Sequence, residues 1–286
     1  MNAVNPRGAS IVDKTNRFLR GQGIKWCIYG LLVINFFLYF FEEVSKATLV
    51  LNADSSWLAW SAMLKTTIDE IGWIGLLLAF ELETYHLSYR AMALRRVRWS
   101  LWALRFGCYA LLFHTVLTNV NASREYLAIE EPLVIEDLCQ LPDQGFFYRY
   151  NLDYQSISGD NCQSLSSSSP YFEIESQVVT NADGFKVAGW HAWFDLQDAL
   201  AWIVVVLAIE LAVRLQNQNV TRGRLMLLSQ LARIGYLVLV VDGIFWFSMG
   251  HYLYAFDQAL WIGGFWVIER NLNQWRADID QGKNYD

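Results

Sequence analysis

Long apolar segments separated by charged stretches dominate the pattern of the chain. Six segments approach the roughly twenty residues that a helix needs to cross a hydrocarbon core of about 30 Å. They are residues 24–41, about 63–80, 99–120, 193–213, 225–247 and 250–268. We therefore predict an all-α polytopic membrane protein with six transmembrane helices. The second and sixth of these segments have the shortest apolar runs or the most polar residues.

A unit of thirteen residues recurs in three of the six segments. Its copies are DEIGWIGLLLAFE (69–81), DALAWIVVVLAIE (198–210) and DQALWIGGFWVIE (257–269), with Asp first, Trp and Ile at the fifth and sixth positions and Glu last. The copies fall in predicted helices two, four and six, which run in the same direction across the membrane. This internal repeat predicts three related helical hairpins in series.

The segment 121–189, between predicted helices three and four, has a different pattern. GFFYRYNLDY (145–154) and YFEIESQVVT (171–180) alternate with the period of two that is typical of half-buried strands, and a serine-rich loop separates them. We predict a small β-rich cap here. The expected organisation is then 1–23, a terminal segment; 24–120, helices one to three; 121–189, the cap; 190–269, helices four to six; and 270–286, a tail.

Composition and charge support a membrane location and give an orientation. Hydrophobic residues make up 54% of the chain and aromatic residues 15%, more than in an ordinary soluble domain. Of the 22 Lys and Arg residues, 15 lie before helix one, between helices two and three, between four and five, or after six. Because positive loops stay in the cytoplasm, we expect both termini there. The cap would then be periplasmic or extracellular, and the membrane a bacterial-type inner (plasma) membrane.

The cap segment carries two of the four cysteines, Cys139 and Cys162. In an oxidising compartment these would form a disulfide that stabilises a domain with little core of its own. The segment has 11 acidic and 3 basic residues, which excludes nucleic acid and anionic lipid as its partners. A protein partner at the cap fits this charge, and the lipid bilayer surrounds the rest.

Polar residues in the outer half of the predicted helices form an acidic layer. Its members, the candidates for ion or proton binding, are Asn35, Asp69, His114, Asp198, Asp242 and Asp257. Lys65 is the only fixed positive charge near them, and excess acid at membrane depth requires protonation, a bound cation or water. The alternative places these aspartates in solvated headgroups, with Trp73, Trp202 and Trp261 as an aromatic belt.

A second polar layer lies toward the predicted cytoplasmic side, and its charges balance. It contains Lys25, Glu81, Arg105, Glu210, Arg233 and Glu269. Ionisable residues are tolerated at this depth when they are paired. We expect structural ion pairs that hold neighbouring hairpins together, and the alternative is a gate or ion path.

Evidence for a metal site or a catalytic centre is weaker. His191, Asp195 and His251 flank the outer ends of helices four and six and could bind a divalent metal, but no diagnostic metal spacing is present. The chain also lacks a nucleophile elbow, a phosphate loop, a dinucleotide fingerprint and a CxxC pair. The sequence therefore requires no cofactor.

Taken together, these patterns favour an inner-membrane protein of the transport or channel type that handles a cation or protons through its acidic outer layer. The alternative is a non-transporting sensor or assembly subunit whose cap binds a partner protein. A third hypothesis is a membrane-embedded enzyme that uses His114 and one of the aspartates. The transported species and the oligomeric state stay open at this point.

Overall fold

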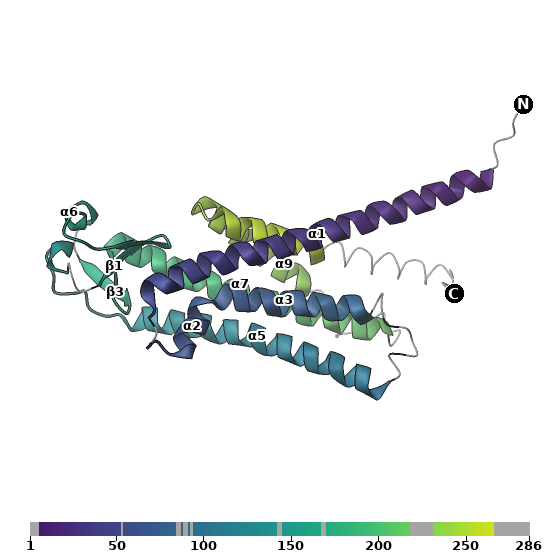
Figure 1. Ribbon diagram of the computed structural model, residues 1–286, viewed down its shortest axis with the longest axis horizontal. Helices are drawn as coiled ribbons and strands as arrows, with labels where there is room; N and C mark the ends of the chain where they lie inside the picture. The colour runs from purple at the N-terminus through teal and green to yellow at the C-terminus, as the bar shows by residue number, and fades with distance from the viewer. Residues whose placement is uncertain are drawn as a thin grey trace, which may run out of the picture. The chain divides into compact units, whose positions relative to one another are not determined.

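A computed structural model describes residues 6–52, 54–83, 87, 91, 94–141, 145–166, 170–217 and 231–265 of the chain (Figure 1). These parts are mostly helical. The helices are α1 (Pro6–Val50), α2 (Trp57–Met63), α3 (Lys65–Glu81), α5 (Arg95–Ala128), α6 (Cys162–Leu165), α7 (Ala182–Asn217) and α9 (Leu231–Ser248), with the short 3₁₀ helix η2 at Leu138–Gln140. The strands are β1 (Phe147–Tyr150), β2 (Asp153–Ser156), β3 (Tyr171–Glu175) and β4 (Val178–Asn181). Residues 252–265 are also helical.

Three of the described helices are long and apolar enough to cross a membrane. They comprise Trp26–Val50 in α1, Arg95–Ala128 in α5 and Ala182–Leu211 in α7. The structure is thus compatible with the predicted membrane protein. Helices also lie in the other three predicted segments. Six membrane crossings, the three-hairpin repeat and the orientation stay predictions.

The chain divides into two compact units, residues 1–37 with 243–286, and residues 38–242. In the larger unit α3 packs along α5, and α5 packs along α7 (Figure 1). Glycines allow the first of these contacts to be close. A Cβ atom added to Gly72 would lie 2.9 Å from Cδ2 of Leu112, and one added to Gly75 would lie 2.5 Å from Sγ of Cys108. Small residues at such contacts are typical of membrane helix pairs.

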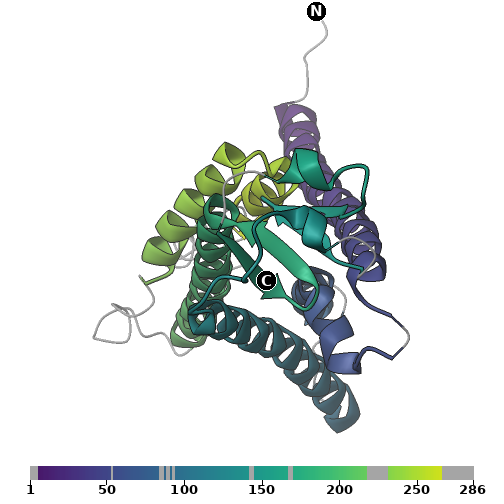
Figure 2. The same ribbon diagram turned by 90° about the vertical axis from the view of Figure 1, so that its left-hand side faces the viewer.

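The predicted cap is a four-stranded sheet with the order β2-β1-β4-β3, and it faces the viewer in Figure 2. The two central strands, β1 and β4, are parallel, and each outer strand pairs antiparallel with its neighbour. The predicted disulfide between Cys139 and Cys162 is confirmed. It adjoins a small core formed by Leu138, Leu141, Ile157, Cys162, Tyr171 and Val179.

Both stretches whose alternation predicted strands contain strands, but each also contains a tight turn. In 145–154 the chain reverses at Asn151 and Leu152, which both have positive φ angles (49° and 70°). This is the requirement of a two-residue type I′ hairpin turn. In 171–180 the reversal includes Gln177, with φ 60°. Two turn residues preserve the alternation of period two, so the pattern alone did not separate one strand from two.

Stacked aromatic rings pack the cap against α5, which precedes it in the chain, and α7, which follows it. β4 leads directly into α7. The ring of Phe185 in α7 stacks on Phe172 of β3 at 4.3 Å and on Tyr126 of α5 at 4.6 Å. A side chain at Gly189 would collide with the Tyr126 ring. The cap is therefore held against the adjoining ends of α5 and α7.

Candidate functional site

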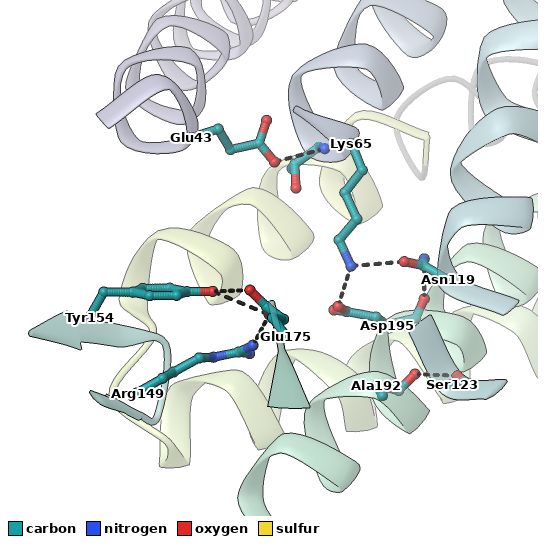
Figure 3. A network of polar contacts seen from close by, with 10 residues as sticks. Glu43, Lys65, Asn119, Ser123, Arg149, Tyr154, Glu175, Ala192 and Asp195 are labelled. Carbon is teal, nitrogen blue, oxygen red and sulfur yellow. Dashed lines mark hydrogen bonds and ion pairs between the residues drawn. The ribbon is translucent and has the colours of Figure 1, made fainter. Parts of the chain in front are cut away.

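A network of polar side chains joins three helices of the larger unit near their cap ends (Figure 3). Nζ of Lys65, the first residue of α3, donates to Oδ2 of Asp195 in α7 at 2.6 Å and to Oδ1 of Asn119 in α5 at 2.8 Å. Nδ2 of Asn119 donates in turn to the backbone carbonyl of Asp195 at 3.0 Å. One lysine thus links α3, α5 and α7.

Glu43, near the end of α1, supports the same corner from the other side of Lys65. Its two carboxylate oxygens accept the backbone N–H groups of Thr66 and Thr67, each at 2.8 Å. The first N–H groups of a helix lack intrahelical partners, and the helix dipole favours an anion there. The start of α3, directly after the break at Leu64, is therefore capped by a buried carboxylate from another helix.

Asp242 of α9 has the least solvent-exposed side chain among the acids of the predicted outer layer. Its side chain has no solvent exposure. Oδ1 accepts a hydrogen bond of 2.6 Å from Nε2 of Gln197 in α7, while Oδ2 has no hydrogen-bond partner among the described residues. A buried charge without a partner is unfavourable, and the group shifts its pKa and becomes neutral instead. The neutral amide of Gln197 does not compensate a charge on this carboxyl.

Asp69 accepts a hydrogen bond from the tryptophan of its own repeat unit. The indole N–H of Trp73 donates to Oδ2 of Asp69 at 2.9 Å, so the first and fifth positions of the unit form a hydrogen bond within one helix. The Trp73 ring is buried and lies 5.5 Å from that of Trp202, the corresponding residue of the second copy. Trp261 is buried as well.

The proposed aromatic belt of Trp73, Trp202 and Trp261 is therefore wrong, because all three face the protein interior. Their side chains pack against other helices or rings instead of lying at a lipid surface. The exposed tryptophans in the described helices are a different set: Trp26, Trp57, Trp99, Trp102, Trp190 and Trp193.

The remaining members of the predicted outer layer have separate partners. Nε2 of His114 lies 3.1 Å from the Ser61 hydroxyl, which connects α5 to α2. In the smaller unit Nδ2 of Asn35 donates to Oδ1 of Asp257 at 2.6 Å. Asp198 is partly buried on α7. The structure thus pairs Asn35 with Asp257, while Asp69, His114 and Asp242 bond to residues outside the predicted set.

In the predicted inner layer, Arg105 of α5 forms an ion pair of 2.6 Å with Glu83, two positions beyond the predicted Glu81. Glu210 accepts a hydrogen bond from the hydroxyl of Tyr109. Glu81 itself is buried at the end of α3, whereas Arg233 is exposed near the start of α9. The side chain of Lys25 and the whole of Glu269 lie outside the described residues.

Among the described residues no group of three His, Cys, Asp or Glu side chains could hold a metal ion. His191 is buried on α7, four residues before Asp195. The ring of His251 packs against Trp246 and Tyr254, with centroids 5.6 and 5.9 Å apart, in the other unit. The geometry adds nothing in favour of a metal centre.

No family model, curated protein or solved structure matches the chain.

Three residues with direct contacts to this network were not predicted from the sequence. Glu43, Asn119 and Gln197 form hydrogen bonds with Thr67, Lys65 and Asp242, respectively. Asn119 and Gln197 are neutral amides within long apolar helices, where a polar group also requires an internal partner. A search of the apolar segments for amides as well as charges would have found both.

Proposed function

We propose that the protein binds and transfers protons within the membrane, through the carboxyl groups around Lys65, Asp195 and Asp242. The observation that carries this proposal is the environment of Asp242: a fully buried carboxyl with a neutral amide on one oxygen and no described partner on the other. A group of this kind is most simply neutralised by a proton.

The other acids of the network differ from Asp242 in having a positive partner. Asp195 has Lys65, and Glu43 has the N-terminus of α3. Gln197, which donates to Asp242, lies two residues after Asp195 on α7. We therefore expect the protonation of Asp242 and the Lys65–Asp195 ion pair to influence each other, as proton transfer or proton sensing requires.

A proton is favoured over a metal cation as the species handled. A divalent cation requires several oxygen or nitrogen ligands that converge on one point. Within the described parts of the chain the acids are distributed over separate partners, and none forms such a group. A single carboxyl is enough to bind a proton.

Proton flux into proteoliposomes tests the proposal. Vesicles containing a trapped pH-sensitive dye and a potassium diffusion potential would be compared for the wild type, Asp242→Asn, Asp183→Asn and no protein. We expect Asp242→Asn to reduce the flux to that of protein-free vesicles. Asp183→Asn, at a highly exposed acid of α7, should keep the wild-type flux.

Thermal unfolding in detergent provides the control for folding. Asparagine keeps the size of the aspartate and can still accept from Gln197, so Asp242→Asn should unfold at or above the wild-type temperature. A wild type with no flux above that of empty vesicles would overturn the proposal. So would an Asp242→Asn protein that conducts fully.

The surface of the cap favours a second candidate, the non-transporting subunit. Val134 is fully exposed and Leu127 is 76% exposed, beside a cap that contains a disulfide and a four-stranded sheet. Exposed apolar side chains next to a rigid scaffold suit contact with a protein. A photo-crosslinker at Val134 would test this in native membranes. One specific adduct, lost after Leu127→Asp and kept after Asp153→Asn, would support the subunit, and absence of flux would then be expected.

A further inference from the structure

A cavity of about 210 Å³ lies at the end of α3 and the beginning of α5, far along the helices from the cap. Its lining residues are Glu83, Arg98, Leu101, Trp102 and Arg105. None of them belongs to the network around Lys65 and Asp242. The cavity is smaller than the roughly 300–1,000 Å³ typical of sites for drug-sized ligands, which limits an occupant to a small group.

The charge of the cavity is positive. Arg98, Trp102 and Arg105 recur at intervals of four and three residues, so they share one face of α5. Arg105 is neutralised by its ion pair with Glu83. Arg98 is exposed, and among the described residues its guanidinium has no hydrogen-bond or ion-pair partner. The lining therefore has one acid against two arginines, a net charge of plus one.

The neighbouring surface has the character of a membrane interface. The side chains of Trp99 and Trp102 are more than 60% exposed on an apolar helix. Arg95 and Arg96 are exposed in the first turn of the same helix. Exposed tryptophans beside clustered arginines are typical of the depth at which lipid headgroups lie.

We propose that this cavity binds the phosphodiester of an anionic phospholipid headgroup. Arg98 supplies a planar pair of N–H donors that match two phosphate oxygens. Trp102 packs against the glycerol, and Leu101 forms the apolar floor. A phosphodiester carries a single negative charge, which matches the net charge of the lining. Glu83 repels a more highly charged anion and holds Arg105 in place.

Native mass spectrometry of the full chain in detergent tests the site, with phosphatidylglycerol, phosphatidylcholine and inorganic phosphate as probes. We expect phosphatidylglycerol to bind more tightly than phosphatidylcholine, because the positive choline group of the latter is repelled by the positive lining of the cavity. Arg98→Gln should weaken its binding about ten- to a hundredfold, the effect of losing a hydrogen bond to a charged group. Arg96→Gln is the matched control, because residue 96 faces the other side of α5.

A second variant tests the role of the acid. Glu83→Gln should tighten phosphatidylglycerol binding, because it removes the negative charge that competes for Arg105. Equal binding of the two lipids, or equal losses in Arg98→Gln and Arg96→Gln, would overturn the proposal. Inorganic phosphate at millimolar concentration should not displace the lipid. Full displacement would identify free phosphate as the ligand and overturn the assignment to a lipid.

Discussion

Replacing Lys65 by methionine removes the one positive charge of the polar network and keeps most of the apolar length of the side chain. Two contacts are lost: the ion pair with Asp195 at 2.6 Å and the hydrogen bond to Asn119 at 2.8 Å. Asp195 then loses its counter-ion. We therefore expect Lys65→Met to destabilise the packing of α3 against α5 and α7.

The magnitude follows from the type and burial of the contacts. A hydrogen bond to a charged group contributes about 1.5–3 kcal/mol, and removal of one partner of a buried ion pair costs about 3–5 kcal/mol. Both side chains here are 25% exposed, so solvent screens part of the interaction. We expect a loss of about 2–3 kcal/mol in the free energy of unfolding, below the value for a fully buried pair.

Unfolding in mixed detergent micelles, titrated with a denaturing detergent, measures this loss. The matched control is Lys186→Met, which removes a lysine paired with Asp183 where both side chains are 71% exposed. Such surface pairs contribute about 0–1 kcal/mol. The double variant Lys65→Met/Asp195→Asn should recover about 1–2 kcal/mol relative to the sum of the single variants. Equal losses at residues 65 and 186, or strict additivity, would refute the reasoning.

Two further predictions concern packing and pH. Gly75→Leu should destabilise the protein by about 1–3 kcal/mol through overpacking, because its Cβ would lie 2.5 Å from Sγ of Cys108. The control is Gly107→Leu, where a Cβ meets nothing within 4 Å, and it should change the unfolding temperature little. Similar changes of the unfolding temperature in both variants would contradict the close contact between α3 and α5. Burial raises the pKa of Tyr154 in the cap, so above pH about 10 the unfolded chain loses a proton that the folded cap retains. The stability of the cap should therefore fall as the pH rises from about 10, and Tyr154→Phe should lessen this fall. Proteolysis at a series of pH values measures the effect. An identical fall in both proteins would contradict the burial of the Tyr154 hydroxyl as its cause.

The apolar pattern predicted that the chain is mostly helical, and three of the helices are long and apolar enough to cross a membrane, because length and hydropathy are local properties of the sequence. The disulfide could also be predicted, since only two cysteines lie in the cap segment. The two hairpins of the cap could not be predicted from the sequence pattern. A two-residue turn such as Asn151–Leu152 leaves the alternation unchanged, and Leu152 is not a residue that signals a positive φ angle.

The polar network was predicted only in part. The repeat identified Asp69 and its tryptophan, but it contained no information on whether that ring faces lipid or protein. The partner of Lys65 is Asp195, which is not part of the repeat. Which helices lie side by side is a tertiary property, and one sequence does not specify that α3 contacts α5. The ion pairs between helices could therefore be identified only from the structure.

The order of synthesis gives the corner around Lys65 a further property. The three helices that meet there are made in succession, and Lys65 precedes Asn119 by 54 residues and Asp195 by 130. At about 5–20 residues per second, the ribosome supplies the amide roughly 3–11 s after the lysine and the carboxylate only after about 7–26 s. During membrane insertion Asn119 is thus the first of its two partners to be made. Only the arrival of α7 completes the corner, so a nascent chain that ends before Asp195 lacks the ion-pair partner of Lys65.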